Sequence, residues 1–169
     1  MKIKTKFTAL IVAFLITTVG ISQEKKVASP AETVKGKISG ADVTIMYGSP
    51  SVKGRTIWGE LVPFDAVWRA GANDATMFIT DKPLTVEGQK LPAGKYSLFV
   101  IPNQKETTII FNRVAKQWGA YEYDQKEDQI RVKVKPQIVE TSTEKLVYKI
   151  NANNVTLSWD KWNLPISIK

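Results

Sequence analysis

Positions 47–76 hold the residues best suited to chemistry, in a stretch rich in Gly, Pro, Trp and Arg. Its first part, GSPSVKGRT, combines glycines with Lys53 and Arg55. Exposed backbone amides and cations of this kind can hold a carboxylate, phosphate or sulfate. The spacing does not fit a nucleotide-binding P-loop, because five residues rather than four separate Gly48 from Gly54. The alternative is a structural loop in which Arg55 pairs with a local carboxylate.

The second part, VWRAGANDAT, places Trp68 and Arg69 before a turn and Asn73 and Asp74 after it. In a functional interpretation, the arginine fork, the amide and the carboxylate recognise a small polar ligand, and the indole forms a stacking wall. In a structural interpretation, Arg69 instead bridges Asp74 or Asp65. Asn73 then caps the turn, and Trp68 fills the core. The sequence alone leaves both interpretations open.

A third motif, WGAYEYD, clusters Trp118, Tyr121 and Tyr123 with carboxylates. Aromatic clusters of this kind form sugar-binding platforms in secreted β-sandwich proteins, and they also suit ordinary packing at a sheet edge. The first two of these aromatic residues complete the candidate ligand-binding set. That set is Lys53, Arg55, Trp68, Arg69, Asn73, Asp74, Trp118 and Tyr121.

The chain contains no histidine and no cysteine. It therefore lacks a Ser-His-Asp triad, a thiol nucleophile and a conventional zinc site, and no cofactor is expected. The rival to a binding protein is a hydrolase or lyase that uses Asp74 with Arg69 or Lys53. Ser51 and Lys53 are the remaining serine-based pair, but no oxyanion hole is recognisable. An inverting glycosidase would need a second acid about 6.5 to 9.5 Å from Asp74.

Two charged stretches are better explained as solvated surface. The acidic turn at 124–128 lacks the spacing of an EF-hand, so we expect no metal site there. RVKVK at 131–135 places three cations on one face of a strand, but no aromatic residues alternate with them as nucleic-acid binding requires. The net charge of +8 is spread along the chain. Nucleic acid is therefore not an expected partner.

The first 22 residues have the pattern of a secretory signal peptide. Three lysines precede an apolar run over 7–19 that is too short to span a bilayer, and small residues predict cleavage before Gln23. Without cysteine there is no lipobox, so we expect an exported protein of the periplasm, the envelope or the extracellular space, with neither a lipid anchor nor a remaining membrane span. Residues 23–169 then form a single domain that is stabilised by its core without disulfides.

Outside the long stretch, apolar and polar residues alternate as they do in β-strands. Strands are predicted over 32–38, 42–47, 76–80, 84–86, 90–91, 95–101, 107–111, 129–135, 145–150, 155–159 and 162–168. Turn residues separate them, and no long helix is predicted. The fold class is therefore all-β, an antiparallel β-sandwich of about ten strands with one long covering loop. A single flattened barrel is the main alternative.

The segment YSLFVI at 96–101 is apolar on both faces, which predicts a central strand covered on both sides. Something must cover the face that carries Phe99 and Ile101. The long loop is the largest segment without a predicted strand. We therefore expect Trp58 and Trp68 of that loop to cover this face.

Four motifs closely resemble, in this order, those of a secreted bacterial family known as domain of unknown function 2911. They are GSPSVKGRTIWGELVPF, VWRAGANDAT, LPAGKYSLFVIP and WGAYEYD. The resemblance covers residues 28–169 and implies an exported protein, but no reaction and no catalytic residues. The family usually has Arg at the position of Ser49 and Glu at the position of Asp74. If that arginine belongs to an anion site, the site is weaker in this chain.

These patterns favour an exported β-sandwich protein that binds a small polar or anionic ligand, a glycan or a partner protein of the envelope. The alternatives are the histidine-free hydrolase or lyase and a structural envelope scaffold without a ligand. The binding hypotheses require that Arg55, Arg69 and Asp74 reach solvent in a common cleft.

Overall fold

The computed structural model describes residues 28–169, so the predicted signal peptide and its cleavage site lie outside the described residues. Within residues 28–169, no helix is long and apolar enough to cross a membrane. The prediction of an all-β protein with about ten strands is confirmed. The elements are β1 (Ala31–Ile38), β2 (Ala41–Gly48), β3 (Thr76–Thr80), β4 (Leu84–Val86), β5 (Gln89–Leu91), β6 (Gly94–Ile101), β7 (Thr107–Asn112), the 3-10 helix η1 (Gln125–Glu127), β8 (Asp128–Val134), β9 (Gln137–Ile150) and β10 (Asn154–Ser167).

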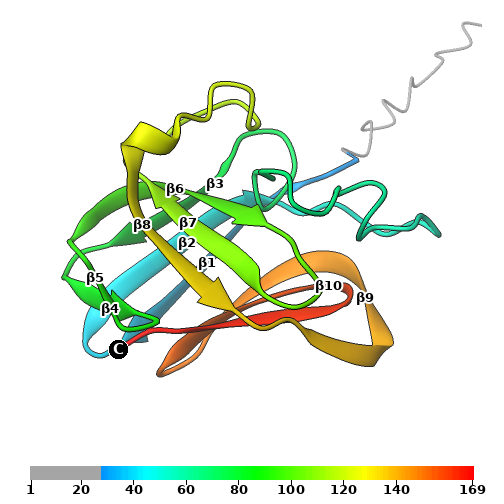
Figure 1. Ribbon diagram of the computed structural model, residues 1–169. Helices are drawn as coiled ribbons and strands as arrows, with labels where there is room; N and C mark the ends of the chain where they lie inside the picture. Colours follow the sequence, from blue (N-terminus) through cyan, green and yellow to red (C-terminus); the bar gives the residue numbers. More distant parts are fainter. Residues whose placement is uncertain (1–27) are drawn as a thin grey trace, which may run out of the picture.

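Six strands form one antiparallel sheet in the order β1-β2-β3-β6-β7-β8, and β4 pairs with β5 in a small hairpin (Figure 1). A turn at Ser39 and Gly40 joins β1 to β2, and both residues have positive φ angles, as a tight hairpin turn requires. Strand β6 is buried on both faces, as its sequence predicted. The larger layer of the fold is thus a six-stranded sheet.

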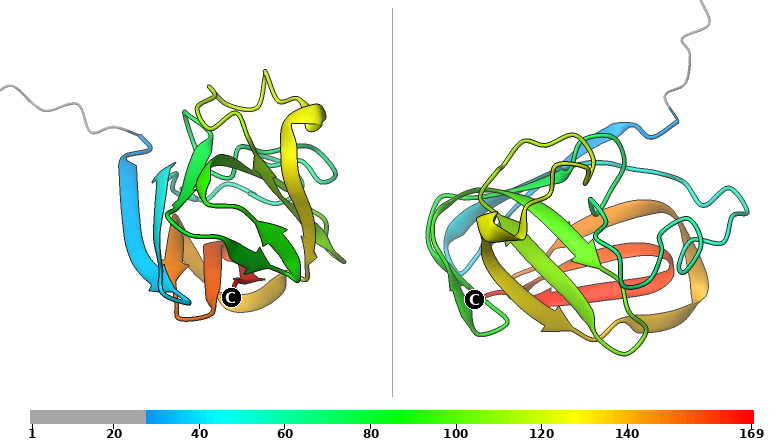
Figure 2. Two further views of the ribbon diagram at one scale, coloured as in Figure 1. Left: turned by 90° about the vertical axis from the view of Figure 1, so that its left-hand side faces the viewer. Right: turned by 45° about the horizontal axis from the view of Figure 1, so that its top comes forward.

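Strands β9 and β10 pair with each other and form the second layer, which faces the larger sheet (Figure 2). Strand β10 turns back on itself at Asp160, whose φ is 48°. As a result, Ile168 just after its end donates a backbone hydrogen bond of 2.9 Å to Asn153 just before its start. The separate strands predicted over 155–159 and 162–168 are therefore the two arms of β10.

The main core lies between the two layers. In β2, Val43 and Ile45 are buried in it, whereas Met46 is exposed on the outer face of the sheet. Part of that outer face is covered by residues 113–127, which we call the cap segment; it is the yellow segment above the sheet in Figure 1.

The prediction that Trp58 and Trp68 cover the Phe99 face is wrong. Phe99 is fully buried, and its ring lies 5.0 Å from the ring of Tyr123 in the cap segment. The long loop contributes only its last part to this cover, through Val67 and the residues that follow. The cap segment was overlooked because its aromatic residues suited a surface platform or a sheet edge, and no regular apolar period marks the segment as a cover.

Trp58 and Trp68 instead join a cluster with Trp159 and Trp162 of β10 on the core side. The rings of Trp58 and Trp162 stack at 4.6 Å, and those of Trp68 and Trp159 stack at 5.8 Å. Trp58 Nε1 also donates a hydrogen bond of 3.3 Å to the carbonyl of Trp159. The two loop tryptophans therefore fasten the long loop to the second layer.

Polar side chains anchor the cap segment to the outer face of the sheet. Gln117 Nε2 donates hydrogen bonds of 3.0 Å to Ser97 Oγ and to Asn112 Oδ1. The Tyr123 hydroxyl donates a hydrogen bond of 2.6 Å to Asp128 Oδ2. The side chain of Asp128 is only 6% exposed, so this carboxylate is a buried anchor for the segment.

Candidate functional site

The end of the long loop meets the cap segment in a short pairing of residues 73–75 with residues 117–119, which we call the ledge. Asp74 and Trp118 form an antiparallel bridge at its centre. Backbone hydrogen bonds of 2.9 and 3.2 Å flank this bridge. The ledge therefore joins two motifs that are far apart in the sequence.

Residues that face each other in an antiparallel pair project to the same side. The carboxylate of Asp74 and the indole of Trp118 therefore lie on one side of the ledge, and both are exposed to solvent. The exposed fraction of Trp118 is 62%, which is high for so large an aromatic residue. An aromatic surface beside an acidic group is thus presented to solvent.

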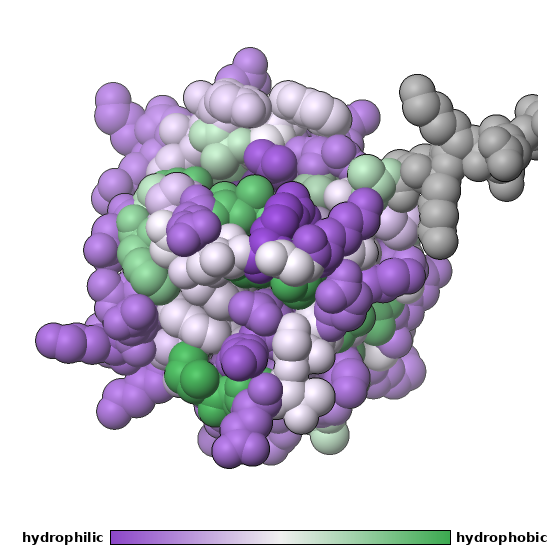
Figure 3. Space-filling view, turned by 90° about the vertical axis from the view of Figure 1, so that its right-hand side faces the viewer, coloured by the Kyte–Doolittle hydropathy of each residue, from purple (hydrophilic) through white to green (hydrophobic). Residues whose placement is uncertain are grey.

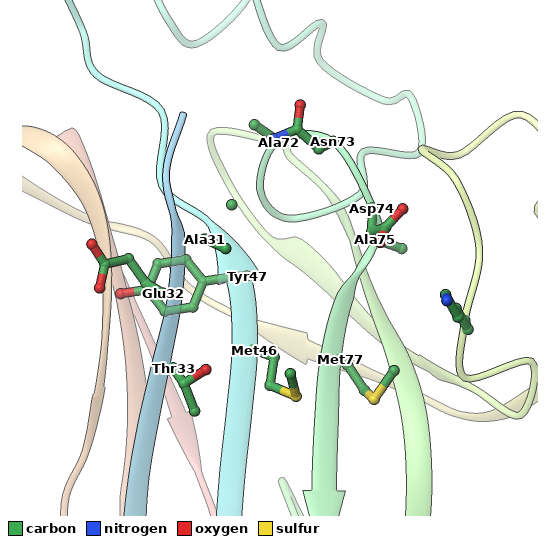
Figure 4. Close-up of a pocket in the computed structure, with 12 residues that line it drawn as sticks. Ala31, Glu32, Thr33, Met46, Tyr47, Ala72, Asn73, Asp74, Ala75 and Met77 are labelled. Carbon is green, nitrogen blue, oxygen red and sulfur yellow. The ribbon is translucent and has the colours of Figure 1, made fainter. Parts of the chain in front are cut away.

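A surface pocket of about 380 Å³ lies beside the ledge. Met46 of β2 and Met77 of β3 are direct partners in the sheet and supply its apolar surface. Figure 4 shows these two methionines at one end of the pocket and the loop of Ala72 and Asn73 at the other. The volume is in the range of small-molecule sites.

The polar groups of the pocket come from three segments. Thr33 of β1 contributes a hydroxyl, Asp74 of the ledge a carboxylate, and Lys116 an ammonium group. Glu32 also lines the pocket, but its carboxylate points away from the methionines (Figure 4). Asn73 also lines the pocket, and its Nδ2 donates a hydrogen bond of 3.3 Å to a backbone carbonyl before β1. Burial raises the pKa of Tyr47 above its usual range. Its hydroxyl lies on the core side of the sheet, where it accepts a hydrogen bond of 3.4 Å from the backbone amide of Tyr148.

The pocket thus combines donors, acceptors and an apolar wall, which suits a polar organic molecule. Among residues 28–169, no group of three or more acidic side chains is placed to hold a metal ion.

Arg69 and Tyr121 flank Gly119 on the ledge. A Cβ atom at Gly119 would lie 2.9 Å from the Tyr121 ring and 3.6 Å from Arg69 Nη1. Arg69 is half-buried, and within the described part of the chain it forms an ion pair with neither Asp74 nor Asp65. The internal clasp proposed for this arginine is therefore not formed.

The other candidates lie elsewhere. Arg55 Nε and Nη2 donate hydrogen bonds of 3.1 and 2.5 Å to the carbonyls of Val52 and Ser51, so this arginine closes its own loop. The backbone of Lys53 is bonded to a glutamate of β9, and Trp68 belongs to the tryptophan cluster. Five of the eight candidates therefore meet at the ledge, namely Arg69, Asn73, Asp74, Trp118 and Tyr121.

Ser49 occupies the position at which the resemblance indicates arginine in the family. Its side chain is buried, and its Oγ donates a hydrogen bond of 2.7 Å to the carbonyl of Leu146 in β9. In this chain, the residue at this position therefore connects the long loop to the second layer.

Several pocket residues were missed by sequence reasoning. Met46 gave a usable signal, because strand alternation places it outward on a face that is otherwise polar. Lys116 gave none, because its place beside Asp74 depends on the pairing of two irregular segments. Glu32, Thr33, Tyr47 and Met77 also line the pocket and were missed.

A second groove of about 440 Å³ lies near the turn of β10. It is lined by Trp58, Phe64 and Trp162, and by Ile138, which is 64% exposed. The rings of Trp58 and Trp162 stack on each other, so these faces are already occupied within the protein. From the side of the long loop the surface is mainly hydrophilic, with small separate apolar patches (Figure 3). The ledge is therefore the better candidate site.

The fold and the site define an all-β, sandwich-like protein with a small mixed polar and apolar pocket on the outer face of its larger sheet. The chain belongs to the family described as Protein of unknown function (DUF2911), whose sequence profile matches residues 29–168. Comparison with curated proteins and with solved structures gives no match.

Proposed function

We propose that this protein is an exported β-sandwich module that binds a saccharide at the ledge and its pocket. The observation that carries the proposal is the exposure of Trp118 next to the carboxylate of Asp74. A sugar ring has an apolar face that can stack on an indole, and hydroxyl groups that bond to polar side chains at its edge. Asn73 and Lys116 supply such groups in the adjoining pocket.

The binding test uses short soluble oligosaccharides of glucose, xylose and N-acetylglucosamine, titrated by calorimetry. Trp118→Ala should weaken binding about tenfold or more, because the loss of a stacked aromatic contact exceeds about 1.4 kcal/mol. Its free energy of unfolding should change by less than about 0.5 kcal/mol, since the indole is exposed. Ile138→Ala removes another exposed apolar side chain away from the ledge and should bind as the wild type does. Failure to bind any of these saccharides, or full binding by Trp118→Ala, would refute the proposal.

Export is tested separately. Mass spectrometry of the envelope fraction should find a mature N-terminus near Gln23. An intact Met1 on the folded protein would contradict this part of the proposal.

The rival function, a hydrolase, has one observation in its favour, because Glu32 and Asp74 line the same pocket, although the carboxylate of Glu32 points away from the methionines (Figure 4). Glycoside hydrolysis uses such a pair of carboxylates. Both are exposed, however, whereas a general acid is usually shielded from water. Release of new reducing ends from a bound saccharide, abolished in both Glu32→Gln and Asp74→Asn, would favour the hydrolase. Binding without release favours the module.

A further inference from the structure

The guanidinium of Arg69 has an environment that the fold does not explain. Its Nε atom is buried and has no hydrogen-bond acceptor among the residues that the structure describes. The ion pairs formed in residues 28–169 involve Lys37, Arg113, Arg131 and Lys133, so no carboxylate of that part neutralises Arg69.

An unpaired cationic donor in this position is unfavourable. Buried N–H groups are nearly always hydrogen-bonded, and the cost of leaving one unpaired is larger when the group is charged. A partly buried charge without a counter-charge also lowers stability. Arg55 shows the usual solution in this chain, because its guanidinium is bonded to two backbone carbonyls. Arg69 has no such hydrogen bonds to backbone carbonyls, which indicates that its acceptor comes from outside the chain.

The surroundings of Arg69 reach the surface of the protein. A Cβ atom at Gly119 would lie 3.6 Å from Arg69 Nη1 and 2.9 Å from the ring of Tyr121, so this ring packs on the glycine next to the guanidinium. Tyr121 is 84% exposed, so the place opens to solvent. A planar guanidinium presents paired N–H groups that match the oxygens of carboxylate, phosphate or sulfate.

We propose that Arg69, beside Gly119 and Tyr121, forms a binding site for an oxyanion. The shared chemistry is a group with two or more negatively charged oxygens, supplied by an acidic saccharide, by a phosphorylated or sulfated molecule, or by a free anion. Gly119 follows Trp118 directly and begins a turn with a φ of 67°, so the site adjoins the ledge at this turn. The site uses Arg69 rather than Trp118 and Asp74, on which the proposed saccharide stacking depends.

The test observes the Arg69 Nε–H group directly by nuclear magnetic resonance in the folded wild-type protein. Acetate, phosphate and sulfate are titrated separately at constant ionic strength, with chloride as the control anion. We expect a saturable shift of this signal with at least one oxyanion and none with chloride. Acetate distinguishes a preference for planar carboxylates from a preference for the tetrahedral anions. Arg69→Lys assigns the signal, because it removes the Nε–H group and keeps the charge.

A matched pair of variants then measures affinity. Arg69→Gln should weaken binding of the effective anion about tenfold or more, which corresponds to the loss of one charge-assisted hydrogen bond. Arg55→Gln removes an arginine whose donors are already bonded to backbone carbonyls, so its affinity should not change. The wild-type titration decides the question even if Arg69→Gln does not fold. A signal that fails to shift in every titration of the wild type, a shift of equal size with chloride, or an affinity measured by calorimetry that is the same in both variants would overturn the proposal.

Discussion

The hydrogen bond between Tyr123 and Asp128 gives the sharpest test of how the cap segment is held. Tyr123→Phe deletes the hydroxyl that lies 2.6 Å from Asp128 Oδ2, while the ring contact with Phe99 is retained. Hydrogen bonds to a charged group contribute about 1.5 to 3 kcal/mol. Asp128 keeps its bond from Asn112 Nδ2, so the carboxylate is not left wholly unpaired. We therefore expect a loss of about 1.5 to 3 kcal/mol in the free energy of unfolding.

Urea denaturation measures this loss, and Tyr121→Phe is the matched control. Tyr121 is 84% exposed, so deletion of its hydroxyl should cost less than about 0.5 kcal/mol. Asp128→Asn should also destabilise the protein, and the double variant with Tyr123→Phe should lose less than the sum, because both changes weaken one interaction. Additive losses, or a cost for Tyr123→Phe as small as that of the control, would refute the reasoning.

Three further predictions follow from the described contacts. Burial raises the pKa of Tyr148 above the usual tyrosine value, so the unfolded chain releases this proton first as the pH increases. The free energy of unfolding should therefore fall above about pH 10, and Tyr148 contributes at most about 1.4 kcal/mol of this fall per pH unit. In urea titrations, the free energy of unfolding of Tyr148→Phe should decline less steeply over the same pH range. Arg69→Gln and Asp74→Asn should have additive effects on urea stability, because the two side chains form no ion pair; a strong coupling between them would restore the clasp interpretation. Trp159→Ala removes a buried ring that stacks on a loop tryptophan and should cost about 3 to 5 kcal/mol by denaturation, whereas a cost below about 1 kcal/mol would show that the cluster does not fasten the loop.

Strand alternation predicted most of the fold because a half-buried strand must place its apolar residues on one face. Val43 and Ile45 against Met46 are a direct example, and the break in β10 at Asp160 was visible as a gap between two alternating runs. The first half of β9 was not predicted, since its residues are largely exposed on both faces and show no apolar period. Local pattern therefore identifies strands that pack against the core, and fails for those that do not.

The candidate site was predictable in composition but not in assembly. Arg69, Asn73 and Asp74 were found because a guanidinium, an amide and a carboxylate lie close together in one motif. These residues meet Trp118 only because two irregular segments pair with each other. No hydrophobic period in the sequence predicts that pairing. The two loop tryptophans were assigned to the wrong face, because the sequence shows that β6 needs two covers but not which segment supplies each.

The ledge also has a consequence for local stability. Its pairing is short and lies between two loops at an exposed end of the sheet, so it should open without unfolding of the core. Backbone amides that close it, such as those of Ala75 and Gly119, would then exchange with solvent deuterium faster than amides within β6 and β7. A molecule that binds only the closed pairing would slow this exchange, and the binding surface would become ordered as it is occupied.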